Sequence, residues 1–177
     1  MAKIVTLKDN NDNIVYPITP VDGVFVDNNT TLADELNNKV DKGSTNIITV
    51  RKTSTSSDVG QTTIAMDATS AVVGTKLTLD SSGVKIGSGV QKVLVSANVF
   101  YDSVSGKAYG WYDLRINGTT TGVETIASIT NSSYGSAVMS PVLLTVSAGD
   151  VITLYNKESG SKIRGGYATY MTVQVVE

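Results

Sequence analysis

The sequence feature that most restricts the fold is the spacing of apolar residues after Gly43. From there to the C-terminus, apolar residues alternate with polar ones or form short runs, and Gly, Asn, Asp or Ser separates successive segments. Because a strand points successive side chains to opposite faces, this pattern predicts many short β-strands in a sandwich or barrel. We therefore expect an all-β domain over 44–177. Its strands are expected near 46–52, 62–67, 72–80, 84–87, 91–101, 108–117, 122–130, 136–147, 150–157 and 166–176.

Two of these segments show the alternation most clearly and define a predicted core face. The residues on that face are Val93, Val95, Ala97, Val99 and Tyr101 in 91–101, and Gly110, Tyr112, Leu114 and Ile116 in 108–117. The other face of 108–117 carries Tyr109, Trp111, Asp113, Arg115 and Asn117. Aromatic side chains are favoured at protein and sugar contacts, so Tyr109, Trp111 and Arg115 are candidate ligand contacts. Packing in the core or between subunits is the alternative for Trp111 and its aromatic neighbours.

The first part of the chain predicts a small hairpin. The apolar segments 3–8 and 14–18 flank residues 9–13, whose Asp and Asn side chains tolerate left-handed turn conformations. A hairpin of this size has no core of its own and is expected to order only against a partner surface. We therefore assign residues 1–27 to attachment. The candidate docking residues are Ile4, Val5, Ile14 and Tyr16.

A short helix is expected next, within a linker that spans 28–43. Thr31 can cap the helix, lysines lie near its end and Gly43 follows it, which is the usual order of helix start and stop signals. About three turns of helix are marginal in isolation, so this helix should pack against copies of itself or under the next domain. The candidates for that contact between copies are Leu32, Leu36 and Val40. Docking on another protein is the alternative role.

Charge and hydropathy exclude several classes of partner. Charged residues make up only 17% of the chain, the net charge is -2, and the basic residues are spread out. Phosphate binding needs clustered basic side chains, so we expect no nucleic-acid partner. No run of about 18 apolar residues could span a bilayer, and the N-terminus lacks the apolar region of a secretory signal. We therefore expect no membrane insertion and synthesis in the cytoplasm of the producing cell.

The chain contains neither cysteine nor histidine. Thiol nucleophiles, Ser-His-Asp hydrolases and the usual zinc sites are therefore excluded, and we expect no catalytic residue, no metal and no cofactor. Residues 9–20 begin like a calcium loop, but Ile14 stands where glycine is needed and Pro20 where a bidentate glutamate belongs. A glycosidase pair remains an alternative, because sequence spacing does not reveal how far apart two carboxylates lie across a sheet. The acids considered for it are Asp102, Asp113, Glu124 and Glu158.

From Gln91 onward, the order of features resembles the tumour necrosis factor/C1q-like jelly roll that recurs in the heads of bacteriophage fibres and spikes. The segments that carry the resemblance are 93–101, 113–118 with its Asn-Gly turn, 142–155 with its Ala-Gly-Asp turn, and 166–176. Residues 3–42 are similar in style to the N-terminal segments of phage structural proteins, through Lys8-Asp9 and Ile14 to Pro17 ahead of a short helix. The resemblance implies a jelly-roll head over 44–177 and a homotrimer. It also makes Tyr167 and Tyr170 candidates for the trimer interface.

This resemblance, together with the lack of catalytic side chains, leads to a functional hypothesis. We expect a phage virion structural protein that is displayed on the particle surface as a trimeric head fibre, decoration or spike. Residues 1–27 would dock on another virion protein, of the capsid or the tail, and the head would assist adhesion to host surface glycans through many weak contacts. The alternatives are a tail or baseplate receptor-binding protein, a cytokine-like or adhesin module outside any virus, and a glycan depolymerase.

Overall fold

The computed structural model describes residues 7–8, 14–15, 45–102, 109–128, 134–158 and 161–177. The chain divides into two compact units, Met1–Ser44 and Thr45–Glu177. In the first unit, β1 (Leu7–Lys8) and β2 (Ile14–Val15) pair in antiparallel fashion, as the predicted hairpin requires. The expected helix lies outside the described residues.

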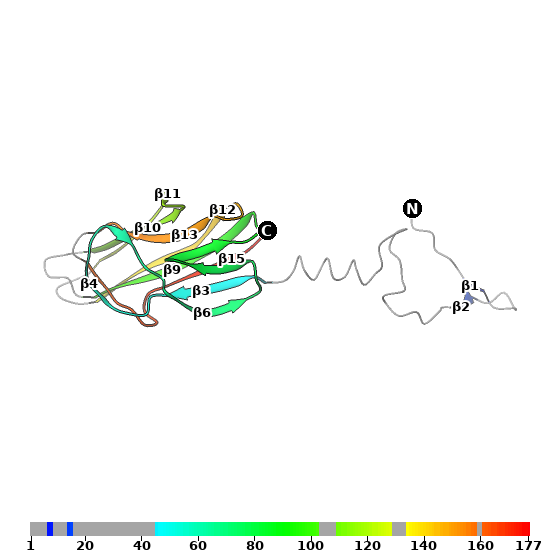
Figure 1. Cartoon of the computed structure of the whole chain (residues 1–177), viewed down its shortest axis with the longest axis horizontal. Coiled ribbons are helices and arrows are strands. Elements are labelled where there is room, and N and C mark those ends of the chain that lie inside the picture. Colours follow the sequence, from blue (N-terminus) through cyan, green and yellow to red (C-terminus); the bar gives the residue numbers. More distant parts are fainter. Residues whose placement is uncertain (1–6, 9–13, 16–44, 103–108, 129–133, 159–160) are drawn as a thin grey trace. The chain divides into compact units, whose positions relative to one another are not determined.

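The second unit, which we call the head, consists of two antiparallel sheets (Figure 1). The seven-stranded sheet has the order β4 (Ser56–Val59), β14 (Ser161–Ile163), β9 (Lys92–Asp102), β15 (Tyr170–Val175), β3 (Ile47–Arg51) and β6 (Ala68–Val73), and β12 (Gly135–Thr145) also pairs with β9. The six-stranded sheet has the order β11 (Thr119–Ser128), β10 (Tyr109–Ile116), β13 (Val151–Asn156), β8 (Gly83–Ile86) and β7 (Leu77–Asp80), and β5 (Thr62–Thr63) pairs with β13. The described residues of the head contain no helix, which confirms the all-β prediction. No helix in the described part of the chain is long and apolar enough to cross a membrane.

The core lies where the predicted faces of β9 and β10 meet. The buried side chains of these two strands include Val93, Val95, Ala97, Val99 and Tyr101 from β9, and Tyr112 and Leu114 from β10. The Tyr101 hydroxyl donates to Asn156 Oδ1 at 3.1 Å, and the Tyr112 hydroxyl donates to the Ala137 carbonyl at 3.2 Å. Burial raises the pKa of both phenols, so they stay neutral and act as hydrogen-bond donors inside the sandwich.

Some predicted strands need correction. The single strand expected over 72–80 is two strands, β6 and β7, because Gly74 takes a positive φ of 77° and turns the chain between the two sheets. Strand structure within the expected 62–67 is limited to β5. The prediction also missed β4 and β14, whose sequences Ser-Ser-Asp-Val and Ser-Lys-Ile have too few apolar residues to show an alternation. The expected final strand begins later, at Tyr170, after a turn through Gly166.

Candidate functional site

The outward face of the seven-stranded sheet carries a mostly apolar row that crosses four strands. Because Val93 and Val95 are buried, Leu94 between them points away from the core. In register, Leu94 lies opposite Leu143 of β12 and Gln174 of β15, and Gln174 lies opposite Ile47 of β3. Leu143 is 56% exposed in the single chain. An apolar row of this length on a solvent-facing sheet is the kind of surface that proteins use for contacts with other chains.

A second row on the same face mixes apolar, aromatic and polar side chains. Val138 of β12 lies opposite Asn98 of β9, which in turn lies opposite Tyr170 and then Arg51. Val138 is 65% exposed, and the Oδ1 atom of Asn98 is buried without a hydrogen-bond partner. Between the two rows, the hydroxyls of Thr49 and Thr172 share a hydrogen bond of 2.9 Å. This face therefore combines exposed apolar side chains with polar groups, some of which are buried or bonded to one another.

One end of this face gathers arginines and aromatic rings, which we call the arginine–aromatic cluster: Arg51, Phe100, Tyr134, Arg164 and Tyr167. The Arg51 guanidinium lies 4.6 Å from the centre of the Tyr167 ring. The Arg164 guanidinium lies 5.2 Å from the Tyr134 ring and 5.7 Å from the Phe100 ring, and the centres of these two rings are 5.8 Å apart. Cations over ring faces at these distances attract the aromatic quadrupole.

The outward face of the six-stranded sheet carries a different arrangement, in which charges and rings satisfy one another. Trp111 Nε1 donates to Glu124 at 3.0 Å, and Lys157 forms an ion pair with the same carboxylate. The Lys157 ammonium also lies 4.0 Å from the centre of the Trp111 ring. The hydrogen bond from Lys157 is the main reason why the pKa of Glu124 is lowered, so this carboxyl stays ionised at neutral pH.

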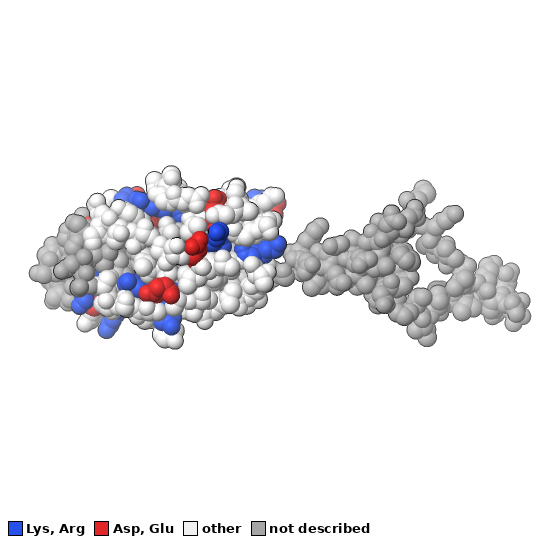
Figure 2. All heavy atoms as spheres, viewed as in Figure 1, with Lys and Arg blue, Asp and Glu red and all other residues white. Residues whose placement is uncertain are grey.

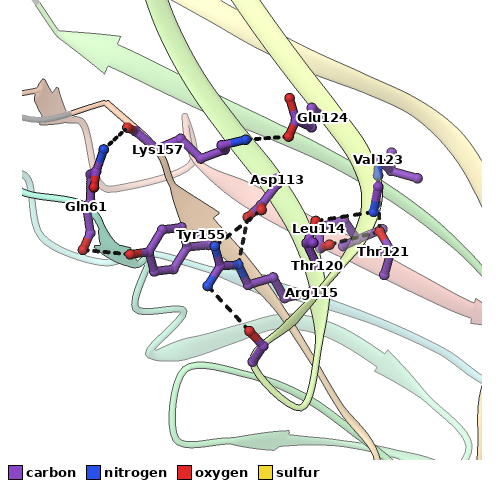
Figure 3. A network of polar contacts seen from close by, with 12 residues as sticks. Gln61, Asp113, Leu114, Arg115, Thr120, Thr121, Val123, Glu124, Tyr155 and Lys157 are labelled. Atoms are coloured by element: carbon purple, nitrogen blue, oxygen red, sulfur yellow. Dashed lines mark hydrogen bonds and ion pairs between the residues drawn. The ribbon is translucent and has the colours of Figure 1, made fainter.

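The same face holds a buried carboxylate beside this group (Figure 3). Asp113 is only 1% exposed and accepts two hydrogen bonds from Arg115, at 2.9 and 3.3 Å. The Arg115 guanidinium stacks 3.4 Å from the centre of the Tyr155 ring, and the Tyr155 hydroxyl donates to the Gln61 carbonyl at 2.9 Å. The rings of Trp111 and Tyr155 are thus each covered by a cation from their own chain.

These contacts determine what the predicted ligand residues can do. Trp111 and Arg115 do lie on one outward face, as predicted, but both have partners within the chain. Tyr109 belongs to β10, and its side chain lies outside the described residues. The residues Asp113 and Glu124 stand opposite each other, yet each carboxylate is held by a cation. A glycosidase needs one protonated carboxyl, and the lowered pKa of Glu124 works against that role.

The other predicted site residues fall into two groups. Tyr167 and Tyr170 both belong to the outward side of the seven-stranded sheet. Ile14 lies in β2, where it pairs with Lys8 of β1. The remaining candidates lie outside the described residues: Ile4, Val5, Tyr16, Leu32, Leu36 and Val40. Val138 and Leu143 were not predicted as surface contacts, although the apolar residues on both faces of β12 were an available signal. It also missed the arginine–aromatic cluster, whose members are far apart in the sequence.

Charged side chains are sparse on the visible face of the head (Figure 2). In the part of the chain that the structure describes, there is no group of three or more acidic, cysteine or histidine residues that could hold a metal ion.

The fold of the head is shared with solved structures of very different sequence. Murine APRIL superposes with a TM-score of 0.60 and 15% identity, over 75% of this chain and 99% of that one. The Eiger TNF of S. frugiperda gives 0.58 and 13% identity, over 76% and 94%. The globular domain of zebrafish complement 1qA gives 0.54 and 9% identity, over 73% and 94%. No protein-family model and no curated protein sequence matches the chain. The head therefore has the TNF/C1q-like jelly-roll fold that the sequence predicted.

Proposed function

We propose that this chain is a trimeric, non-enzymatic display and adhesion protein of a bacteriophage virion. The observation that carries the proposal is the exposed apolar surface on the outward face of the seven-stranded sheet, which includes Leu143 and Val138 of the edge strand β12. Exposed apolar patches of this kind on a small domain are typical of protein interfaces. The fold itself is one that commonly assembles into trimers, which makes three copies the expected number.

A cyclic trimer would cover this face without leaving an open end. In a ring of three, each subunit presents one patch to a neighbour and receives a different patch, so the assembly closes. The mixed character of the face suits such an interface, because interface cores combine apolar and aromatic side chains with a few polar groups. Tyr170, which lies between Asn98 and Arg51 in the second row, is the predicted interface residue with the most central position.

The virion role rests on the sequence. The phage-like style of residues 3–42 and the hairpin of β1 and β2 support an attachment segment ahead of the head. Docking of this segment on a capsid or tail protein would display three heads per site, and many sites per particle would turn weak contacts into high avidity. A head with few charges suits contact with host surface polymers. We favour a head fibre or decoration over a tail or baseplate receptor-binding protein, because the described residues form a hairpin and a jelly-roll head rather than a shaft.

The mass of the full-length protein in solution tests the assembly. Light scattering coupled to gel filtration should give three times the 18.6 kDa of one chain. A single-chain mass across the micromolar range would contradict the trimer. Labelling intact particles with an antibody against the head then tests the location. Label around the capsid supports a head fibre, label at the tail tip supports the receptor-binding alternative, and unlabelled particles would remove the virion role.

A further inference from the structure

The two arginines of the arginine–aromatic cluster form no ion pair with an acid among the described residues. Among the described residues, neither Arg51 nor Arg164 lies within ion-pair distance of a carboxylate. The Nε atom of Arg51 is buried and has no hydrogen-bond partner. Arg115, on the other sheet, shows the opposite arrangement, since its guanidinium is held by Asp113. The cluster therefore holds two guanidinium groups that form no direct ion pair with a described carboxylate.

Two described acids near the cluster form contacts with other residues. Asp102 follows Phe100 on the same face of β9 and forms an ion pair with Lys162 at 3.7 Å. Asp67 accepts hydrogen bonds from the Thr53 backbone and hydroxyl at 2.7 and 2.8 Å. Neither carboxylate is available to Arg51 or Arg164.

Stacking on a ring leaves the in-plane N–H groups of a guanidinium free to bind an anion. Those donors form a fork that matches the geometry of a carboxylate or a phosphate. The rings beside them are open as well, because Tyr134 is 58% and Tyr167 is 79% exposed. Exposed aromatic faces pack well against the apolar faces of sugar rings. The cluster combines donors for an acidic group with platforms for a saccharide.

We propose that the arginine–aromatic cluster binds acidic saccharides, with Arg51 and Arg164 holding a carboxylate or phosphate group and with Tyr134 and Tyr167 packing against the sugar. This inference deepens the proposed adhesive function by naming the class of its ligand. It also moves the expected ligand site from the six-stranded sheet, where Trp111 and Arg115 are occupied by their own chain, to the opposite face of the head.

The cluster and the apolar row occupy different parts of the outward face. Phe100 lies six residues from Leu94 along β9, which corresponds to about 20 Å at about 3.3 Å per residue. Arg51 lies two strands away from β9, or roughly 10 Å across the sheet. We therefore assign Arg51 and Tyr167 to the sugar site, so that of the two tyrosines made interface candidates by the resemblance only Tyr170 remains at the contact between copies.

Calorimetric titration of the full-length protein at low salt tests the proposal. The probes are digalacturonate for a carboxylate and glucose 6-phosphate for a phosphate, with digalactose and glucose as their neutral counterparts. We expect millimolar binding of at least one acidic probe and at least tenfold weaker binding of its neutral counterpart. The acidic probe that binds more tightly identifies the acidic group that the site prefers. Equal affinity for acidic and neutral sugars, or no binding of either acidic probe, would overturn the proposal.

Substitutions separate a built site from general charge attraction. Arg164→Gln and Arg51→Gln should each weaken the acidic probe at least fivefold, and Tyr134→Ala should weaken it although it removes no charge. Lys85→Gln is the matched control, because it also removes one positive charge but lies on the six-stranded sheet. A loss as large in Lys85→Gln as in the arginine variants would reduce the effect to net charge and refute the site.

The mass of each sample, measured in parallel, distinguishes this inference from the proposed assembly. Binding by a protein that proves to be a single chain would support the site while contradicting the trimer. A trimer that binds neither acidic probe would contradict the proposed saccharide site but not the proposed assembly. Circular dichroism of Arg51→Gln and Arg164→Gln shows whether the variants keep the fold, and Arg164→Lys, which keeps the charge but loses the fork, should bind with intermediate strength.

Discussion

Asp113 shows how much one outward-facing side chain can matter to this head. Its carboxylate is almost completely buried and depends on Arg115 for compensation. We expect Arg115→Met to lower the free energy of unfolding by about 2–3 kcal/mol, somewhat less than for a fully buried pair because Arg115 is partly exposed. Chemical denaturation at a fixed protein concentration measures the change. The double variant Asp113→Leu with Arg115→Met should recover most of the loss, and a double variant as unstable as the single one would refute the explanation.

Gly110 is required by the ring of Tyr101. A Cβ atom at Gly110 would lie 2.2 Å from Cδ2 of Tyr101, whose hydroxyl is fixed by Asn156. We expect Gly110→Ala to destabilise the head by about 1–3 kcal/mol through overpacking. Gly60→Ala is the control, because no atom lies within 4 Å of its Cβ position. Thermal melting should show a clear decrease for the first variant and little change for the second.

Asp67 should make the head sensitive to acid. Desolvation opposes its ionisation, but the hydrogen bonds from Thr53 outweigh this effect and lower the pKa of the carboxyl. A carboxyl whose folded pKa is depressed stabilises the fold above its unfolded pKa and loses that contribution as the pH falls through the folded value. Denaturation midpoints of the wild type should therefore fall below about pH 4. Asp67→Asn should show a smaller fall, and an identical pH profile in the two proteins would exclude this group as a cause.

At the scale of elements, two turns hold neighbouring strands together through one side chain. Asn117, at a positive φ of 51°, donates from Nδ2 to Asp150 at 2.7 Å and accepts from the Val151 backbone at 2.9 Å. This links the turn between β10 and β11 to the start of β13. We expect Asn117→Asp to destabilise the head by about 1–2 kcal/mol, because two carboxylates would then meet. Asn117→Gly, which permits the φ angle and lacks the charge, should cost less in the same denaturation assay.

Elements were predictable from the sequence where apolar residues alternate over many positions. Strands β9 and β10 have long alternating patterns, and their core faces were predicted correctly. Strands β4 and β14 were missed because pairing with a neighbour, rather than their own apolar content, holds them in the sheet. The break at Gly74 was missed because Val72 and Val73 continue the apolar pattern up to the turn.

The candidate sites were less predictable, because strand register brings together residues that are distant in the sequence. The outward position of Trp111 and Arg115 follows from alternation, but their partners Lys157 and Tyr155 come from β13. Likewise, Arg51 at the end of β3 contacts Tyr167 only because β15 pairs with β3. This pairing brings the residues just before β15 to the end of β3. A single sequence contains no direct signal for such pairings.

At the scale of the whole molecule, the two outward faces should respond differently to the same change. Leu143→Asp places a charge on the apolar row, so we expect it to convert the trimer to single chains while leaving the fold intact. Ile126→Asp is the matched control, because Ile126 is similarly exposed, at 61%, on the other sheet beside Trp111. Light scattering measures the mass and circular dichroism the fold. Trimers in both variants would exclude this face as the interface.

The position of β15 has a consequence for how the protein is made. This strand is synthesised last, yet it lies between β9 and β3 in the middle of its sheet, and the carbonyl of Glu177 accepts hydrogen bonds from Gln91 and Lys92. The seven-stranded sheet can therefore close only after residues 170–175 have left the ribosome, so folding of the head follows the synthesis of all its other strands. A stop codon at position 170 would leave the whole head without its central strand.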